Sequence, residues 1–351
     1  MKVLVTGATG FLGAWAAREL AARGHSVRVL VRPESRVEAL EGIPAERVPG
    51  DITDIGAVER AVQGCDGVLH AAGVARLRAG HLRHLMAVNR DGTIHVLGAA
   101  LRAGVRRAVH LSSVGAMGGT LEPVAVDETW QGTAETSGVD YFLSKLEGER
   151  AAAAIGRLGL PLVILRPGVV LGPGDVYHSS TGSVLRMARG TMPVCFRGGA
   201  SYCDVRDVAR AQAVALERGK PGELYHVGGH NLEMAELARR VWRITGVPSP
   251  PRVPYSLMVA AAGLREVWGV VEGQPPPVSR QLLSGARRYT FLSSEKARRE
   301  LDYRTRPLEE TLRDTIAWFL EHGDLAAATP KLKALANAAA ARPERVAAPV
   351  A

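Results

Sequence analysis

The stretch TGATGFLG, residues 6–13, places three glycines within seven positions, directly after the aliphatic run KVLV of residues 2–5. Glycine contributes no side-chain packing and loses more conformational entropy on folding than any other residue, so each of the three needs a physical reason. Gly7 permits a tight turn, Gly10 lets an anion approach the backbone N–H groups at a helix start, and Gly13 lets that helix pack closely on the strand. We therefore expect a strand, an anion-binding turn and a helix here.

Alternating strands and helices continue through the first half of the chain. Apolar and β-branched runs predict strands at residues 26–31, near 48, and at 67–72, 107–113 and 160–167, and helical periodicity predicts helices at 11–23, 54–63, 81–103 and 140–158. Strands that alternate with helices form parallel sheets with right-handed crossovers. The expected fold class is α/β, a doubly wound parallel sheet (Rossmann fold), in which the amides of Phe11 and Leu12 would bind a dinucleotide pyrophosphate.

The alternation breaks down after Pro167, which predicts a second, smaller region. Loops are expected over 168–201 and a linker over 273–280, with a strand near 223–229 and helices near 205–218, 233–245, 255–270, 293–301 and 307–322. We interpret residues 1–167 as a dinucleotide-binding domain, to which segments such as 205–228 would return. Residues 168–322 would form a mostly helical substrate lobe, and the Ala-rich residues 323–351 a disordered tail.

Composition narrows the classes of partner. The 44 Lys and Arg residues exceed the 35 Asp and Glu residues, for a net charge of +9, but they are spread along the chain. This distribution favours an anionic small molecule over nucleic acid. The cysteines, Cys65, Cys195 and Cys203, have no CxxC spacing and are expected to be buried thiols of a cytoplasmic protein. We expect no metal site and no membrane insertion, because the apolar stretch 257–271 is short and carries charges.

The end of the second predicted strand bears on the choice of coenzyme. NAD sites place an acidic residue there, whereas an arginine accepts the 2′-phosphate of NADP. This chain has Arg32 at that position and Arg36 four residues later. The sequence therefore favours NADP as the coenzyme, with NAD as the alternative. Arg32 could instead be a surface arginine at a strand end, without a role in coenzyme binding. Asp51 would suit the adenine amino group, with Ile52 beside the ring, although Asp51 could equally cap a helix.

The segment YFLSK, residues 141–145, carries the predicted chemistry. A spacing of four puts the phenol of Tyr141 and the ammonium group of Lys145 on one helix face. A nearby cation favours the phenolate and brings the pKa of a tyrosine toward neutrality, as proton transfer requires. Ser113, at the end of the fifth predicted strand, supplies a hydroxyl for a substrate oxygen. A YxxxK motif on its own usually marks an exposed helix face. Here it follows the glycine turn and the strand-end serines SSV (112–114) in sequence order, which favours a catalytic interpretation.

Several ordered motifs resemble the extended short-chain dehydrogenase/reductase superfamily over residues 1–322. They are TGATGFLG, GDITD (50–54), HAAG (70–73), VNRDGT (88–93), LSSVGAMG (111–118), YFLSK, LRPGVVLGPGD (165–175) and YCDVRDVA (202–209). The resemblance implies that Ser113 polarises a carbonyl or hydroxyl, Tyr141 exchanges the proton, and Lys145 binds the nicotinamide ribose and acidifies Tyr141.

The resemblance also implies supporting roles. Asn89 would support the proton relay or be purely structural. Ala71 and Ala72 would line the coenzyme, and the segment from Pro167 to Val170 would contact the nicotinamide carboxamide. Asp204 and Asp207 resemble a lobe-anchoring motif. The family's usual homodimer, packed through the helices near 81–103 and 140–158, is expected.

Departures from subfamily patterns suggest a branch. No carboxylate follows Ser113, where sugar dehydratases carry an acidic pair, and Arg166 is followed by Pro-Gly-Val rather than the epimerase asparagine. The pattern looks more like the dihydroflavonol reductase, cinnamoyl-CoA reductase and 3β-hydroxysteroid dehydrogenase branch. We expect an NADP-dependent oxidoreductase that interconverts a ketone and a secondary alcohol on a fairly apolar small molecule. The alternatives are a nucleotide-sugar epimerase or dehydratase and a non-catalytic nucleotide-sensing protein. Residues 177–192 would line the substrate pocket.

Overall fold

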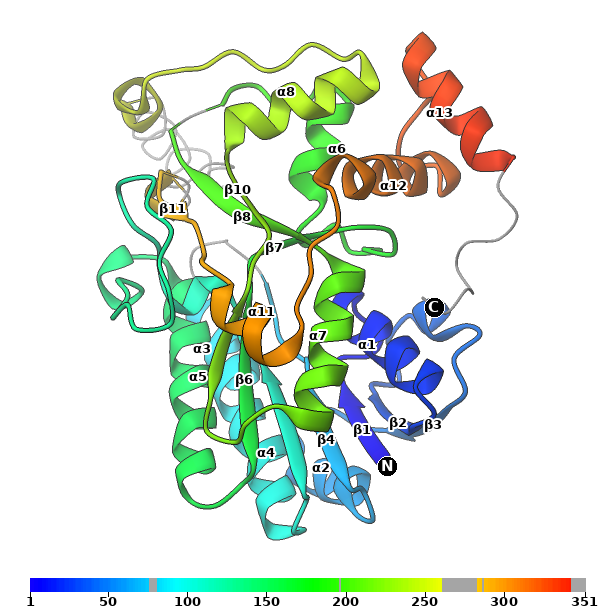
Figure 1. Cartoon of the computed structure of the whole chain (residues 1–351), viewed down its shortest axis with the longest axis vertical. Helices are drawn as coiled ribbons and strands as arrows, with labels where there is room; N and C mark the ends of the chain where they lie inside the picture. The colour runs from blue at the N-terminus through cyan, green and yellow to red at the C-terminus, as the bar shows by residue number, and fades with distance from the viewer. Residues whose placement is uncertain (76–80, 196, 261–282, 286, 342–351) are drawn as a thin grey trace, which may run out of the picture.

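A seven-stranded parallel sheet forms the centre of the larger region (Figure 1). The computed structural model describes residues 1–75, 81–195, 197–260, 283–285 and 287–341. The strands, in spatial order, are β3 (Ala45–Pro49), β2 (Ser26–Val31), β1 (Lys2–Thr6), β4 (Gly67–His70), β5 (Arg107–Leu111), β6 (Leu162–Pro167) and β9 (Leu224–Val227). Every neighbouring pair is parallel. The doubly wound α/β architecture is confirmed.

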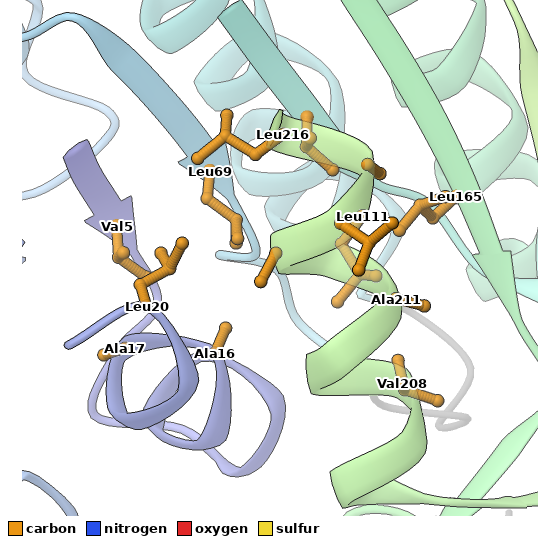
Figure 2. Packing of buried hydrophobic residues seen from close by; sticks show 14 of the residues in the cluster. Val5, Ala16, Ala17, Leu20, Leu69, Leu111, Leu165, Val208, Ala211 and Leu216 are labelled. Carbon is orange, nitrogen blue, oxygen red and sulfur yellow. The ribbon is translucent and has the colours of Figure 1, made fainter. Parts of the chain in front are cut away.

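Helices cover both faces of this sheet because the strands bury side chains on both sides. One face carries α1 (Phe11–Ala22) and α7 (Val205–Arg218), and the other carries α2 (Ile55–Val62), α4 (Gly92–Arg102) and α5 (Asp140–Arg157). Alternation along β1 divides its residues between the two cores, since Val3 and Val5 pack with α1 and α7 while Leu4 packs on the opposite face. Figure 2 shows the first core, where Leu20 of α1 and Val208 of α7 lie over the strands.

Strand order reverses between β1 and β4, which are neighbours in space but not in sequence. In open sheets of this kind, ligands bind outside the carboxyl ends of the strands at such a reversal. The turn TGATGFLG follows β1 and the segment HAAG ends β4, so the fold brings both motifs to this point. The topology therefore positions a ligand site before any side-chain chemistry is considered.

The region after Pro167 contains a small sheet that the sequence analysis did not predict. Strand β8 (Gly199–Asp204) pairs with β7 (Val169–Leu171), β10 (His230–Glu233) and β11 (Tyr289–Thr290). Helices α6 (Gly182–Ala188), α8 (Met234–Thr245), α12 (Leu308–Glu321) and α13 (Pro330–Ala340) lie on this side of the molecule. Residues 168–201 are therefore not all loop. Short strands paired with distant segments give little local periodicity, which explains the omission.

The segment 205–227 and the helices expected near 293–301 and 307–322 lie close to their expected bounds. Helix α7 packs against α1, strand β9 extends the large sheet beside β6, and α11 (Glu295–Leu301) packs on β9. Residues 255–260 are helical as expected. The remainder of the helix expected near 255–270, and the linker expected at 273–280, lie outside the described residues.

The expectation of a disordered tail is wrong for residues 330–340, which form α13. Thr329 caps this helix by accepting a hydrogen bond from the backbone N–H of Leu332 at 3.1 Å, and Pro330 occupies the first turn. Leu332 has no exposed surface and packs in the cluster that includes α8 and α12. Alanine favours helices, and one buried leucine gives this helix a docked face. Residues 342–351 lie outside the described part of the chain.

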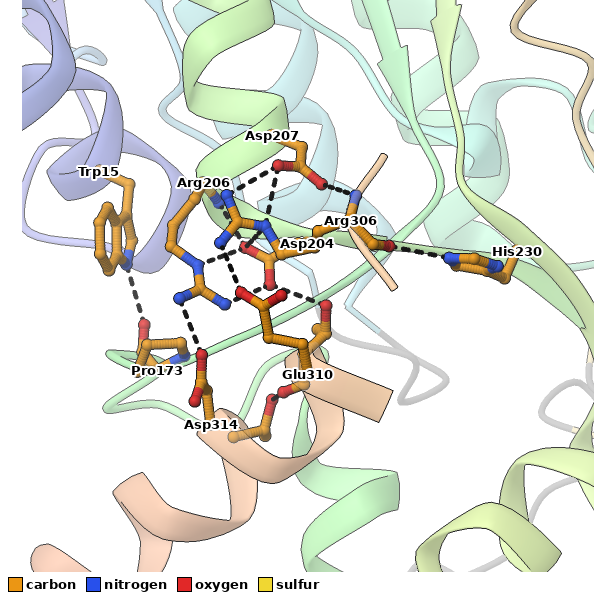
Figure 3. A network of polar contacts seen from close by, with 11 residues as sticks. Trp15, Pro173, Asp204, Arg206, Asp207, His230, Arg306, Glu310 and Asp314 are labelled. Atoms are coloured by element: carbon orange, nitrogen blue, oxygen red, sulfur yellow. Dashed lines mark hydrogen bonds and ion pairs between the residues drawn. The ribbon is translucent and has the colours of Figure 1, made fainter. Parts of the chain in front are cut away.

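A buried ionic network joins α7 to the segment before α12 (Figure 3). The Asp204 carboxylate, which is 2% exposed, accepts hydrogen bonds from Arg206 and from the Thr311 hydroxyl. The Asp207 carboxylate accepts from the Arg306 backbone N–H at 2.8 Å and from its guanidinium at 2.9 Å. These contacts hold the start of α7 against the helical region. In the part of the chain that the structure describes, no helix is long and apolar enough to cross a membrane.

Candidate active site

The glycine turn has the geometry that its sequence indicates. Gly7 has φ +74°, and a Cβ there would lie 2.6 Å from the Ala72 nitrogen, so the turn touches the end of β4. A Cβ on Gly13 would lie 2.2 Å from the Gly7 carbonyl oxygen. Only glycine satisfies both contacts without a backbone shift. Helix α1 begins after Gly10, which has no side chain to cap it. The Gly10 position therefore supplies no side-chain acceptor for the backbone N–H groups of the first turn, which includes Phe11 and Leu12.

These features fit an anionic coenzyme. The macrodipole places partial positive charge at the start of α1, and the turn lies at the sheet's switch point. Ala71 and Ala72 follow β4 and contact Gly7, so they border the same place. Pro167 ends β6, and the Val170 side chain is buried in the core that includes α1 and α7, which leaves its backbone for any contact with a ligand.

The residues expected at the adenosine end lie near one another. Arg32 is 53% exposed, and its Nε lies 3.6 Å from Glu34 Oε1 and 3.9 Å from Asp51 Oδ2. Asp51 Oδ1 accepts hydrogen bonds from the Thr53 backbone N–H and hydroxyl, both at 2.8 Å. A cation and two carboxylates thus share this edge, and the carboxylates would compete with a 2′-phosphate for Arg32.

The two remaining residues expected at this end differ in exposure. Arg36 is exposed, and Ile52 is 7% exposed and packs in the α2 and α4 core. A Cβ on Gly92 would lie 2.6 Å from Ile52 Cδ1, so the close approach of α4 fixes the isoleucine. The position of Ile52 is therefore determined by core packing.

The structure brings Tyr141 and Ser113 into direct contact. Tyr141 lies in the first turn of α5, and its hydroxyl donates to Ser113 Oγ at 3.2 Å, just beyond the end of β5. Ser113 Oγ also accepts from the Gly115 backbone N–H at 3.0 Å. A Cβ at Gly115 would lie 3.0 Å from Tyr141 Cε1. Gly115 therefore admits the tyrosine ring, a role that the sequence analysis missed.

Lys145 is 9% exposed, and its Nζ donates to the Leu111 carbonyl oxygen at 3.4 Å. Burial lowers the pKa of Lys145 to about 8, and the carboxylate of Glu149 opposes that change. Burial raises the pKa of Tyr141, while its hydrogen bond with Ser113 acts in the opposite direction. The expected lowering of the Tyr141 pKa by Lys145 is not found in this structure, because desolvation of the phenolate dominates. Tyr141 is accordingly protonated at neutral pH.

Asn89 lies in a π-helical turn (Ala87–Asp91) and is 3% exposed. Its Oδ1 accepts from the Val74 N–H at 2.8 Å, and its Nδ2 donates to the Val74 carbonyl and to Ser144 Oγ. Ser144 in turn donates to the Tyr141 carbonyl oxygen at 2.8 Å. The Asn89 side chain thus links the segment after β4 to α5, which favours the structural interpretation over the proton relay.

A buried hydrogen-bonded chain that sequence reasoning missed connects β1, β4 and α4. His70 lies between Thr6 Oγ1, at 2.7 Å from Nδ1, and Thr93 Oγ1, at 3.0 Å from Nε2. Thr93 Oγ1 donates to the Asn89 carbonyl oxygen, so it accepts from Nε2–H of His70, and Thr6 donates to Nδ1. Burial lowers the pKa of His70 to about 3, so the ring is neutral. In the sequence, this chain could have been sought from the histidine of HAAG and the threonine of VNRDGT.

The segment expected to line the substrate pocket is organised by a buried carboxylate. Asp175 has no exposed surface and accepts hydrogen bonds from the backbone or hydroxyls of Ser179, Ser180 and Thr181. Tyr177 is 52% exposed, and His178 Nε2 lies 3.1 Å from Asp324 Oδ2 in the segment that joins α12 to α13. His178 thus contacts the helical region.

Comparisons with known proteins agree with the fold. The family model described as "NAD dependent epimerase/dehydratase family" matches residues 3–228. A putative dihydroflavonol 4-reductase of Synechocystis sp. is 33% identical over 325 residues, covering 91% of this chain and 94% of that protein. Sterol demethylase protein B of Methylococcus capsulatus is 34% identical over 331 residues, covering 92% and 99%. Among solved structures, the UDP-glucose 4-epimerase of Thermus thermophilus in complex with NAD is 26% identical with a TM-score of 0.72, covering 91% and 99%.

The family match and the relatives named as reductases make this chain an NAD(P)-dependent enzyme with a Rossmann fold. The chain belongs to the NAD-dependent epimerase/dehydratase family. Members of this family act on hydroxyl and keto groups, and the relatives similar to this chain include several named reductases.

Proposed function

We propose that the protein is an NADP(H)-dependent reductase that interconverts a ketone and a secondary alcohol on a small, fairly apolar substrate. The observation that carries this proposal is the 3.2 Å hydrogen bond from a protonated Tyr141 to Ser113, beside Lys145 and at the carboxyl ends of the strands. Relatives named for a dihydroflavonol and a sterol support an apolar substrate.

In reduction, the substrate carbonyl oxygen would accept hydrogen bonds from Ser113 and Tyr141. When bound, the coenzyme supplies a hydride to the carbonyl carbon. The carbon–oxygen double bond becomes a single bond, and the phenol of Tyr141 gives its proton to the oxygen. Lys145 would bind the ribose hydroxyls, and its positive charge would stabilise the resulting phenolate until solvent reprotonates it. The amides of Phe11 and Leu12 would hold the pyrophosphate, with Arg32 at the 2′-phosphate.

Epimerisation of a nucleotide-linked sugar is the alternative that the solved relatives support. Arg166, followed in this chain by Pro167, Gly168 and Val169, donates two hydrogen bonds to the buried carboxylate of Glu149. The arginine is therefore engaged inside the protein and lacks the following asparagine. This arrangement favours the reductase over a nucleotide-diphosphate site.

The test is the oxidation of NADPH with a panel of ketones, comparing the wild type with Tyr141→Phe. Loss of general acid catalysis is expected to reduce turnover by about 10²- to 10⁴-fold. Tyr225→Phe is the matched control, because that buried phenol donates to Glu300 at 2.9 Å on another part of the sheet. Activity that survives in Tyr141→Phe would contradict the proton-transfer role. Tightly bound coenzyme that is never consumed, with a UDP-sugar that raises thermal stability, would favour the epimerase.

A further inference from the structure

Glu149 lies one helical turn after Lys145 on α5 and is 6% exposed. Its carboxylate accepts hydrogen bonds from the Ser112 hydroxyl at 2.7 Å and from Arg166 Nε at 2.7 Å, and it also accepts from Arg166 Nη2. A single carboxylate therefore joins the helix of Lys145 to the segment after β5 and to strand β6.

Each partner of Glu149 is adjacent in sequence to a residue of the candidate site. Ser112 precedes Ser113, which contacts Tyr141, and Arg166 precedes Pro167, which ends β6 at the coenzyme side. Buried ion pairs contribute little net stability, but they hold a defined geometry when every group is hydrogen-bonded. The three contacts thus fix the relative positions of the segments that carry the reacting groups.

We propose that Glu149 is a positioning residue of the reductase site, which holds Ser113, Lys145 and Pro167 in register and supplies the negative charge that faces Lys145. This inference rests on the proposed function, since it assigns a role within the same site. Glu149 was not among the candidate residues from the sequence, although its spacing of four from Lys145 was the available signal.

The charges around Lys145 come from three elements. Tyr141 and Glu149 lie on α5, His70 on β4 and His110 on β5. Burial lowers the pKa of both histidines, of His70 to about 3, so neither is charged at neutral pH. Tyr141 is protonated. The Glu149 carboxylate opposes the decrease in the Lys145 pKa that burial causes, and the guanidinium of Arg166 on β6 forms an ion pair with that carboxylate.

The first experiment follows the titration of Lys145 by NMR in the full-length protein. The chain has six lysines, so ¹³C-labelled lysine gives a simple spectrum, and Lys145→Arg identifies the signal of interest. Glu149→Gln removes the charge with little change in shape. In this variant we expect the pKa of Lys145, read from the midpoint of its titration, to lie below the wild-type pKa of about 8. Glu147→Gln is the control, because Glu147 lies on the same helix in an exposed pair with Arg150.

The second measurement is the binding of NADPH at two pH values, monitored by its fluorescence. At about pH 6, Lys145 is charged in both proteins, so any difference between their dissociation constants reports the loss of positioning alone. At about pH 8 the Glu149→Gln variant should bind more weakly by a factor of about two to five, because less of its Lys145 is cationic. A purely structural effect would weaken binding equally at both pH values.

A Lys145 midpoint in Glu149→Gln equal to that of the wild type and of Glu147→Gln would overturn the inference. Glu149→Gln leaves Arg166 without its partner and could for that reason fail to fold. The double variant Glu149→Gln/Arg166→Gln then removes both charges, and the expected result is again a Lys145 pKa below that of the wild type. Absence of NADPH binding to the wild type would contradict the proposed function, while the NMR titration would still report on Glu149. The two failures are therefore distinguishable.

Discussion

The indole of Trp15 donates a hydrogen bond from Nε1 to the carbonyl oxygen of Pro173 at 2.9 Å (Figure 3). Trp15 lies in α1, directly after the glycine turn, and Pro173 follows β7 in the smaller sheet's region. The contact is close, since a Cβ on Gly174 would lie 3.3 Å from the same nitrogen. The helix that would bind the pyrophosphate thus contacts the loop that leads into residues 177–192, the segment expected to line the substrate pocket.

Trp15→Phe should remove the hydrogen bond to Pro173 while keeping an aromatic ring packed at this position. The loss of one hydrogen bond should lower the free energy of unfolding by about 1 kcal/mol. The KM for the ketone should rise more than the dissociation constant for NADPH, because the displaced segment is on the substrate side. Urea denaturation and steady-state kinetics measure these quantities. Trp242→Phe is the control, because Trp242 is 46% exposed on α8 and should change neither.

Gly115→Ala should impair catalysis through geometry alone. The added methyl group would lie 3.0 Å from Tyr141 Cε1 and 3.3 Å from Ser113 Oγ, so the ring must move away from the serine. A displacement of this size is expected to reduce kcat by up to about 100-fold. Gly98→Ala in α4 is the control, since its new methyl group would meet only the flexible end of Arg102, and this variant should be as active and slightly more stable. Unchanged kcat in Gly115→Ala would refute the contact's importance.

The lowered pKa of Lys145 predicts a pH dependence of stability with a defined sign. Its folded value of about 8 lies below the usual 10.5, so between these values the unfolded chain binds more protons than the folded one. The free energy of unfolding should therefore gain a contribution from this residue as pH rises through that interval. Lys145→Met should lack this contribution, and urea titrations across the interval measure it. Lys220→Met, at an exposed lysine, should retain the wild-type dependence.

Arg32→Ala should change the coenzyme preference. Loss of a charged hydrogen bond to the 2′-phosphate should weaken NADPH binding by about 10- to 100-fold and leave NADH binding nearly unchanged. Arg36→Ala provides the comparison for a second exposed arginine in the same loop. Calorimetric titration with both coenzymes gives the two dissociation constants. Equal losses of affinity for NADPH and NADH would mean that Arg32 does not contact the 2′-phosphate.

The large sheet and the glycine turn could be predicted because local sequence patterns determine them. Hydrophobic runs indicated the strands, and Gly7 and Gly13 occur where the backbone leaves no room for a Cβ. Tyr141, Lys145 and Ser113 were singled out by spacing and order, and the structure places them around the end of β5. Strands β7, β8 and β11 could not be predicted, because they are short and depend on partners far away in sequence.

The electrostatics of the site also lay beyond sequence reasoning. The expectation that Lys145 lowers the Tyr141 pKa considered the cation alone, whereas burial acts on both groups and dominates for the phenol. The roles of Glu149 and His70 depend on contacts between different strands and helices, so the spacing of Glu149 from Lys145 and the motif HAAG could mark these residues but not their partners. Helix α13 was missed because its Ala-rich composition hid one buried anchor, Leu332.

The order of the strands has a consequence for synthesis on the ribosome. Strand β6 pairs on one side with β9, which is made only after residues 168–223 have emerged, and α7, which covers one face of the sheet, is also late. A nascent chain that ends near Pro167 would therefore expose an unpaired strand edge and an uncovered apolar face, both of which promote aggregation. The first half of this protein should depend on chaperones until its remaining residues arrive.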